Sequence, residues 1–290
     1  MTTRWAGPAL AGALLLSPAA FADEITIRAA PAPIVTAQVN GRPARLQIDP
    51  MLPDVAVFNP ASATRLGVRP TPVLRIRVDL DDASIPGRVA SARIVFANGK
   101  TARALAGLFS APYSTVEGVD GAIGPGVLPY DHVRIVLRDG PTGAGARAFA
   151  LADADIWSVP VPLAGARATL RFNVTRSETV LSRSAGTLLN NAALITPAGD
   201  LVPLTYPLGL STTAQPVRAT SLIGGFAFGP TLARTGAPLG SPDGVDVVTV
   251  TAHRRKPPAY VVTLGRAALT ACSDIEVDRP TRRLTVHCDG

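Results

Sequence analysis

Aromatic and charged residues are both scarce in this 290-residue chain. Phe, Trp and Tyr make up 5% of it and Asp, Glu, Lys and Arg only 17%, whereas there are 26 glycines and 27 prolines. A chain of this length suffices for one large domain or two medium ones with real cores. Abundant Gly and Pro disfavour long helices and are typical of short strands joined by many turns. The composition therefore predicts a mostly-β protein.

Lysine is nearly absent, because Lys100 and Lys256 are the only two. The formal net charge of +7 comes from arginines, which are scattered apart from the run His253-Arg254-Arg255-Lys256. Nucleic-acid-binding proteins usually cluster such charge, interleave it with aromatics or carry a known motif. Neither aromatics nor a motif accompanies the charge here. We expect an arginine-rich solvated surface and no nucleic-acid partner, with an anionic envelope partner as the alternative.

Long apolar runs are missing beyond the N-terminus, which argues against a membrane span in the body of the chain. The first residues, MTTRWAGPALAGALLLSPAAFADE, hold one Arg, an apolar stretch interrupted by Pro8 and Pro18, and then Ala20-Phe21-Ala22. This is the pattern of a secretory signal peptide cleaved after Ala22. An uncleaved anchor is the alternative, but the stretch is too short to span a bilayer. We expect residues 1–22 to be removed and the mature protein to be bacterial and exported, periplasmic or secreted.

Two segments of the chain resemble each other without a gap. VTAQVNGRPARLQID (Val35–Asp49) aligns with VPVPLAGARATLRFN (Val159–Asn173) at an offset of 124 residues. Each copy alternates apolar and polar residues, turns at a Gly and alternates again, which predicts a β-hairpin. A strand-like patch follows each hairpin, VAVF (Val55–Phe58) or TVLS (Thr179–Ser182), and then a predicted short helix, residues 60–66 or 184–189.

The two halves of the chain also close alike. The first ends with Ile123-Gly124 and a strand at Val133–Leu137, and the second with Leu264-Gly265 and a strand at Ile275–Asp278. A solenoid would need more than two copies. We therefore predict an all-β protein with two equivalent lobes, residues 23–152 and 153–290, related by a pseudo-two-fold axis.

These features together resemble the retropepsin-like aspartic proteases, over roughly residues 30–140 and 155–288. The likeness rests on the Asn40-Gly41 turn, the apolar strand that ends at Asp49, the VAVF strand, the A-x-x-L-G turn (Ala63–Gly67) and the D-G-x-x-G segment (Asp120–Gly124). Two fused copies imply a bilobal, pepsin-like arrangement of β-barrel lobes around a cleft.

The family implies one Asp-Thr/Ser-Gly triplet in each lobe, whose two Asp share a proton and activate a water. Here the corresponding positions hold Asp49-Pro50-Met51 and Asn173-Val174-Thr175, and no D-T-G or D-S-G occurs in the sequence. Proline offers neither a hydroxyl nor an N–H, methionine puts a long side chain where the glycine should be, and asparagine cannot supply the second carboxylate.

These departures predict an exported pseudoprotease that lacks catalytic activity and binds a peptide or protein in the cleft, as a monomer and without cofactor or metal. Asp49 would be a degenerate catalytic position, and Asn173 the position of the missing second Asp. Two alternatives stay open: an active aspartic endopeptidase using Asp49 and an unidentified second acid, and a structural envelope protein. Asp49 could also bind a cation or amine, although we favour a role in holding its loop through backbone N–H bonds.

Other chemical patterns are weak or missing. His132, His253 and His287 lie far apart and lack the ligand spacing of a zinc site, and G-x-S-x-G and S-x-x-K do not occur. Asn173-Val174-Thr175 fits the N-glycosylation pattern, but an inter-lobe loop would be poorly accessible. The Gly-rich stretch Leu222–Phe226 is expected to be a turn between strands.

Only two cysteines occur, Cys272 and Cys288, and an exported chain favours a bridge between them. Ser273–Asp278 and Thr281–His287 read as strands joined by a turn at Arg279-Pro280. A hairpin centred on Pro280 pairs residues whose numbers sum to 560, and this places the two cysteines opposite each other. We therefore predict a disulfide, with two reduced thiols as the alternative.

Overall fold

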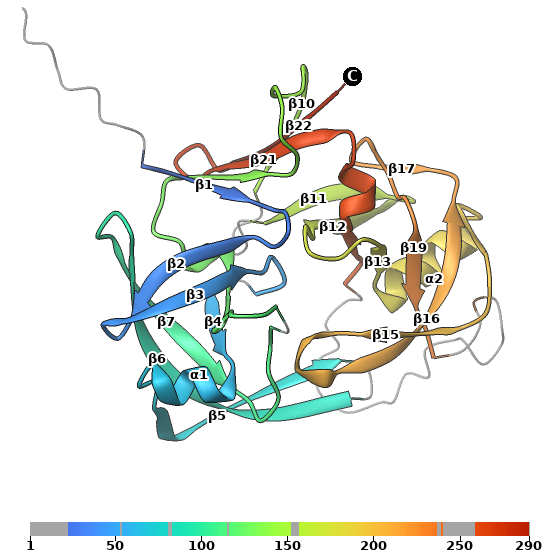
Figure 1. Cartoon of the computed structure of the whole chain (residues 1–290). Coiled ribbons are helices and arrows are strands. Elements are labelled where there is room, and N and C mark those ends of the chain that lie inside the picture. The colour runs from blue at the N-terminus through green and yellow to red at the C-terminus, as the bar shows by residue number, and fades with distance from the viewer. Residues whose placement is uncertain are drawn as a thin grey trace, which may run out of the picture.

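The chain is built mostly of β-strands, which confirms the predicted all-β class (Figure 1). The structure, a computed structural model, describes residues 23–52, 54–80, 83–114, 116–151, 157–236, 239 and 259–289. The expected signal peptide, the predicted lobe boundary near Asp153 and the basic run 253–256 lie outside the described residues. No helix of the described part is long and apolar enough to cross a membrane.

The first half forms a seven-stranded sheet with the order β2-β3-β8-β4-β7-β6-β5, in which an additional β2–β6 pairing closes six strands into a barrel. A short helix, α1 (Pro60–Arg65), follows β4 and starts with proline at a position where the missing N–H costs nothing. The strands are β2 (Ile34–Val39), β3 (Arg42–Ile48), β4 (Val55–Phe58), β5 (Pro70–Leu80), β6 (Ala83–Phe96), β7 (Thr101–Leu108) and β8 (Gly121–Ile123).

The second half forms an eight-stranded sheet with the order β11-β12-β20-β13-β19-β16-β14, and β15 also pairs with β16. The helix α2 (Arg183–Asn191) follows β13 and is capped by Ser182, whose side chain accepts from the Ala185 N–H. The strands are β11 (Ser158–Leu163), β12 (Ala166–Phe172), β13 (Thr179–Leu181), β14 (Ile195–Pro197), β15 (Val202–Thr205), β16 (Ser211–Ala219), β19 (Thr231–Arg234) and β20 (Val261–Leu264). The Gly-rich stretch is the predicted turn, between β17 (Leu222–Ile223) and β18 (Phe226–Ala227).

Six consecutive strands of each sheet have the same order and the same directions. β3–β8 and β12–β20 are parallel, β4–β8 and β13–β20 antiparallel, β4–β7 and β13–β19 parallel, and β6–β7 and β16–β19 antiparallel. The internal repeat seen in the sequence therefore extends to the topology of both sheets.

The two repeated hairpins also share their register. Val35 faces Leu46 across β2–β3, and Val159 faces Leu170 across β11–β12. Their turns have positive φ at both central residues, 50° and 81° at Asn40-Gly41 and 45° and 78° at residues 164 and 165. Positive φ at both positions is the signature of a type I′ turn. The predicted hairpins are confirmed as equivalent elements of their sheets.

A third sheet of five strands draws on both halves. Its order is β1-β9-β21-β22-β10, with β1 (Glu24–Arg28), β9 (His132–Val136), β10 (Gly145–Ala150), β21 (Cys272–Asp278) and β22 (Arg283–Cys288). Figure 1 shows it along the top of the view, with the first sheet at the left and the second at the right. The first and the last strand of the described residues thus belong to one sheet beside the two repeated sheets.

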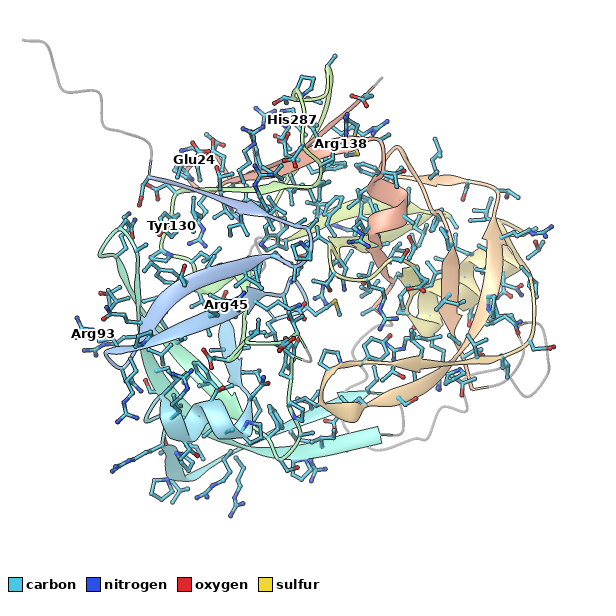
Figure 2. The ribbon with its side chains drawn as sticks, in the orientation of Figure 1. Glu24, Arg45, Arg93, Tyr130, Arg138 and His287 are labelled. Carbon is cyan, nitrogen blue, oxygen red and sulfur yellow. A yellow bond between two sulfur atoms is a disulfide. The ribbon has the colours of Figure 1, made fainter. Side chains whose placement is uncertain are left out.

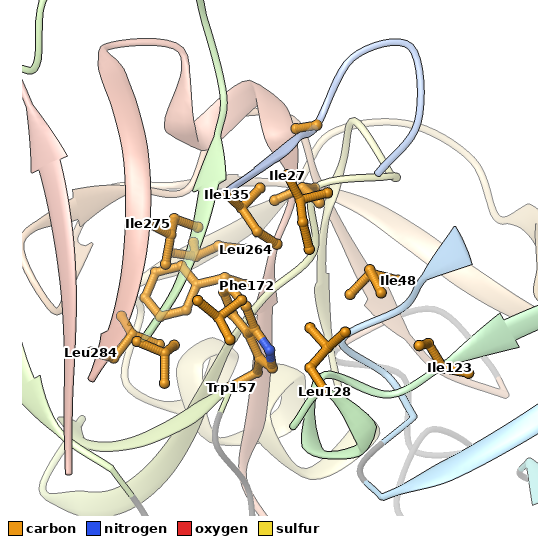
Figure 3. Close-up of a cluster of buried hydrophobic side chains, with 14 of the residues drawn as sticks. Ile27, Ile48, Ile123, Leu128, Ile135, Trp157, Phe172, Leu264, Ile275 and Leu284 are labelled. Atoms are coloured by element: carbon orange, nitrogen blue, oxygen red, sulfur yellow. The ribbon is translucent and has the colours of Figure 1, made fainter. Parts of the chain in front are cut away.

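One hydrophobic core joins the three large sheets. Figure 3 shows side chains from each sheet meeting in this cluster, and they are almost completely buried. Burial of that many large apolar groups is the main force that holds the halves together. The labelled members are Ile27, Ile48, Ile123, Leu128, Ile135, Trp157, Phe172, Leu264, Ile275 and Leu284.

The predicted disulfide between Cys272 and Cys288 is present, but the predicted hairpin register is wrong. The turn is not centred on Pro280, because Asp274 faces His287 along β21–β22, one residue away from the predicted pairing. A β-bulge between Cys272 and Asp274 shifts the register again and brings the two cysteines opposite each other.

The extra residue of the bulge is Ser273, which is buried. Its hydroxyl donates to the Asp274 carboxylate at 2.7 Å and accepts the Gly143 N–H at 3.0 Å. A buried hydroxyl needs such partners, and the bulge supplies them.

Candidate functional site

A cleft of about 1050 Å³ is lined by residues of both halves. On the first half its wall comes from β3, β4, β5 and the segment before β8, and on the second half from β12, β13, β20 and the β15–β16 turn. The ends of the two repeated hairpins meet here, because Asp49 follows β3 and Asn173 follows β12, and both line the cleft. The two residues singled out from the sequence therefore belong to one site.

The two strand ends are built alike. The Asp49 N–H donates to the Ile123 carbonyl at 3.0 Å, and the Asn173 N–H donates to the Leu264 carbonyl at 2.8 Å. Two residues on, the Met51 N–H donates to Asp49 Oδ1 at 2.8 Å and the Thr175 N–H to Asn173 Oδ1 at 2.9 Å. Each side chain thus holds its own loop in an Asx turn. This is the loop-holding role predicted for Asp49.

The Asp49 carboxyl is buried, with 5% of the residue exposed. Its second oxygen accepts the Tyr113 hydroxyl at 2.8 Å. Burial raises the pKa of Asp49, and the hydrogen bonds from Met51 and Tyr113 offset that effect only in part. The protonated, neutral form of Asp49 is consequently favoured to a higher pH than for an ordinary aspartate.

Tyr113 is the residue of this site that the sequence did not reveal. It lies 64 positions from its partner, in a loop with no motif of its own. Asn59 fixes that loop by accepting the Tyr113 N–H at 2.9 Å, and its side chain donates to the Ser114 carbonyl at 3.1 Å. Burial and the neighbouring Asp49 raise the pKa of Tyr113, so the hydroxyl remains a proton donor.

Asn173 has a different environment, rich in donors. Its Oδ1 accepts the Thr175 N–H, the Thr175 hydroxyl at 2.7 Å and the Arg176 N–H at 3.0 Å. Only 7% of Asn173 is exposed, which agrees with the expectation that the glycosylation pattern is poorly accessible. Three donors converging on one oxygen would suit an anion, yet the residue there is a neutral amide.

The rest of the first triplet offers little for catalysis. Pro50 is buried and has no N–H to donate. Met51 lines the cleft with its long side chain, at the position where the family resemblance implies a glycine. The other carboxylates among the described lining residues are Asp79 and Glu178, and Glu178 lies 3.9 Å from the Arg176 guanidinium.

The turn between β15 and β16 reaches across the cleft, and we call residues 205–211 the strap. Its tip residue, Leu208, is 4% exposed and packs in a small apolar cluster whose other members, described below, all belong to the first half. Leu208 has φ 65°, and Gly209 has φ 74°. A left-handed leucine costs about 1–2 kcal/mol, whereas burying a leucine side chain gains about 1.5–3 kcal/mol. Packing of Leu208 against the first half therefore offsets its backbone strain.

The base of the strap is held by its own half. The Arg176 guanidinium donates to the Thr205 carbonyl and lies over the Tyr206 ring, 5.4 Å from its centroid. Because the Arg176 N–H also donates to Asn173, the strap and the second strand end are linked through a single residue.

One group outside the cleft has side chains that metals use. Asp274, Glu276 and His287 bring their ligand atoms within 4.8 Å of one another in the five-stranded sheet. His287 lies on the same side of the molecule as Glu24 and Arg138 (Figure 2). The group already has internal partners, since Asp274 contacts His287 at 2.8 Å and Arg134 at 3.2 Å, and Arg134 also pairs with Glu276. Burial opposes ionisation of Asp274, but bonds from Ser273, His287 and Arg134 lower its pKa overall. This arrangement is that of a partly exposed ion-pair network centred on the buried Asp274.

Comparison with protein-family models gives no match for this chain, and comparison with curated proteins gives none either. The assignment of function therefore depends on the geometry of the cleft and on the repeat.

Proposed function

We propose that the protein is an exported, non-catalytic relative of the aspartic proteases that binds a peptide or an extended protein segment in the cleft. The observation that carries the proposal is the pair of strand ends. Asp49 and Asn173 occupy equivalent places in two equivalent hairpins and line one cleft. An aspartic protease needs a carboxylate at both places.

The surroundings of Asp49 argue against turnover. Both of its oxygens accept hydrogen bonds from the protein, one from Met51 and one from Tyr113. The mechanism requires a carboxylate pair that shares one proton and activates a water. Asn173 can hydrogen-bond such a water but cannot take its proton. These contacts support binding without cleavage as the function of the cleft.

The dimensions and lining of the cleft suit a peptide. Its volume of about 1050 Å³ lies just above the range of about 300–1,000 Å³ that is usual for small-molecule pockets. Apolar residues such as Val57, Val180 and Val261 line it together with polar ones such as Gln47 and Thr263. Apolar walls with a few fixed polar groups can take side chains and hydrogen-bond a backbone.

Export is part of the proposal. The N-terminal signal-peptide pattern supports it, and so does the disulfide, since such bonds persist mainly in oxidising compartments.

Peptide retention tests the proposal. The mature protein, residues 23–290, is immobilised and exposed to a tryptic digest of bacterial envelope proteins, and retained peptides are identified by mass spectrometry. We expect retention without cleavage, and its loss in Val261→Arg, which places a charge in the cleft. The matched control is Val73→Arg, because Val73 is 82% exposed and lies outside the cleft lining. Cleaved peptides would favour the endopeptidase alternative, and equal retention by both variants would exclude the cleft as the binding site.

A further inference from the structure

The strap fills a pocket of the opposite half with a single side chain. Leu208 packs against Val57 of β4, Ala122 of β8, Phe109 and Tyr113, with Leu52, Ile76, Val78 and Ile85 packed around them. Among the residues that the structure describes, Leu208 is the only one of the second half in this cluster. The first half therefore presents an apolar pocket beside the Asp49–Tyr113 pair, and a leucine of the same chain occupies it.

The contact between strap tip and pocket is made by an apolar side chain alone. In the described part of the chain, no hydrogen bond joins residues 207–210 to the first half. The polar contacts of the tip are internal, with the Tyr206 N–H donating to the Leu210 carbonyl at 2.8 Å. Leaving the pocket would cost Leu208 its burial but would break no hydrogen bond to the first half.

Backbone conformation shows that the pocket, rather than the turn, accounts for the leucine. Positive φ at residues 208 and 209 makes this a turn in which glycine, asparagine or aspartate would fit without strain. A leucine there is locally unfavourable. The apolar pocket supplies the compensating contact, so its shape and chemistry match an aliphatic side chain.

We propose that this pocket is the site that receives an aliphatic side chain of the bound peptide, and that Leu208 occupies it in the free protein as an internal substitute. The inference rests on the proposed function and deepens it by naming the ligand class, a peptide with a leucine-like anchor. A ligand gains the pocket by displacing the strap tip, while Arg176 keeps the base of the strap in place. Its apparent affinity is its intrinsic affinity multiplied by the fraction of molecules in which Leu208 has left the pocket.

The test uses the strap itself as the probe. The peptide acetyl-TYPLGLS-amide copies residues 205–211, and acetyl-TYPNGLS-amide is its control. Leu208→Gly empties the pocket and removes the backbone strain, because glycine accepts positive φ. Leu208→Asn is a second emptied variant that tolerates the same conformation. Leu208→Met is the matched control, since it keeps the pocket filled with an apolar side chain.

Isothermal titration calorimetry should show both emptied variants binding the leucine peptide at least about ten-fold more tightly than the unmodified protein and Leu208→Met. The asparagine peptide should bind none of the four detectably. Equal affinity of the leucine peptide for all four proteins, or no binding to either emptied variant, would refute the inference.

The envelope digest separates this inference from the function on which it rests. If the unmodified protein retains digest peptides while neither emptied variant binds the strap peptide, the pocket assignment fails and the proposed function stands. If the emptied variants bind the strap peptide, but neither they nor the unmodified protein retain digest peptides, the pocket assignment is supported and the proposed function fails.

Discussion

The two halves of the molecule share a scaffold and differ at the site that the scaffold forms. Strand order, strand direction, hairpin register and the main-chain bonds of Asp49 and Asn173 coincide. The groups that surround those two side chains differ. In the first half a buried acid accepts two donors, one on each oxygen, and in the second half a single amide oxygen accepts three. Similar backbones therefore carry strand ends with different chemistry.

The two halves differ in how well the groups around each side chain would stabilise a negative charge. The half that holds the carboxyl buries it, and its pKa is raised. The half that could stabilise an anion with converging N–H and O–H groups holds a neutral side chain. An acid–base pair requires two interacting carboxyls whose pKa values are driven apart. The larger group of converging donors therefore surrounds the neutral amide, across the cleft from the ionisable carboxyl.

The largest expected effect is on peptidase activity. We predict no cleavage of fluorogenic casein by the mature protein between about pH 3 and 7, the range in which paired carboxyls would work. Asn173→Asp alone should remain inactive, because Tyr113 still holds Asp49 and Met51 still takes the place of the glycine that the family resemblance implies. Losing one member of a catalytic unit usually costs several orders of magnitude. Cleavage that disappears in Asp49→Ala would overturn this comparison of the halves.

Next in size is the disulfide, which lies in the second half of the chain. The bond closes a loop of about 15 residues in the β21–β22 hairpin, so its removal should cost about 3 kcal/mol in the chain-entropy model. Cys272→Ser combined with Cys288→Ser should show that loss in urea unfolding. The unmodified protein in reducing buffer is the control. A loss below about 1 kcal/mol would mean that pairing within the five-stranded sheet holds the β21–β22 hairpin in place without the disulfide.

Much of the scaffold could be predicted from the sequence, because its signals are local. The hairpin around Asn40-Gly41 follows from strand alternation and a turn pair that accepts positive φ. The β13 strand follows from a short apolar run, and the short helix after it is expected because a similar segment follows the first hairpin. The repeat then transfers these features from one half to the other, although only 4 of 15 aligned residues are identical.

The features that could not be predicted depend on contacts between distant residues. Tyr113 reaches Asp49 only because β8 follows its loop and pairs with β3. The bulge at Ser273 satisfies a buried hydroxyl, which no local pattern indicates. Leu208 has a left-handed backbone conformation that a leucine disfavours. Its packing against residues of the first half explains why a leucine is found there.

Replacing Asp49 by asparagine, the residue at the equivalent position of the second half, should stabilise the protein at neutral and alkaline pH. In the native protein the folded state keeps the Asp49 proton to a higher pH than the unfolded chain. Stability from this group is therefore present below about pH 4, the ordinary aspartate pKa, and is lost as pH rises through the raised pKa. Asp49→Asn removes that loss and keeps an acceptor for the Met51 N–H.

We expect Asp49→Asn to be about 1–3 kcal/mol more stable than the unmodified protein at pH 8, the usual cost of a poorly compensated buried polar group. The two proteins should converge towards pH 4 in urea unfolding. Tyr113→Phe is the opposite control, because it removes a bond that lowers the Asp49 pKa and should destabilise the protein at pH 8. A stability difference that does not change with pH would contradict the raised pKa.

The smallest expected effect tests the donor-rich strand end. Thr175→Val removes one of three donors to Asn173 Oδ1 and leaves the Thr175 and Arg176 N–H groups in place. Because the threonine is exposed and two donors remain, we expect a loss of only about 0.5 kcal/mol, the low end for a hydrogen bond. The same change in the Asn173→Asp background should cost more, since hydrogen bonds to a charged acceptor contribute about 1.5–3 kcal/mol. A double-mutant cycle on urea midpoints at pH 7 measures the difference. A coupling near zero would mean that the second half stabilises a carboxylate no better than an amide, and the electrostatic contrast between the halves would then be lost.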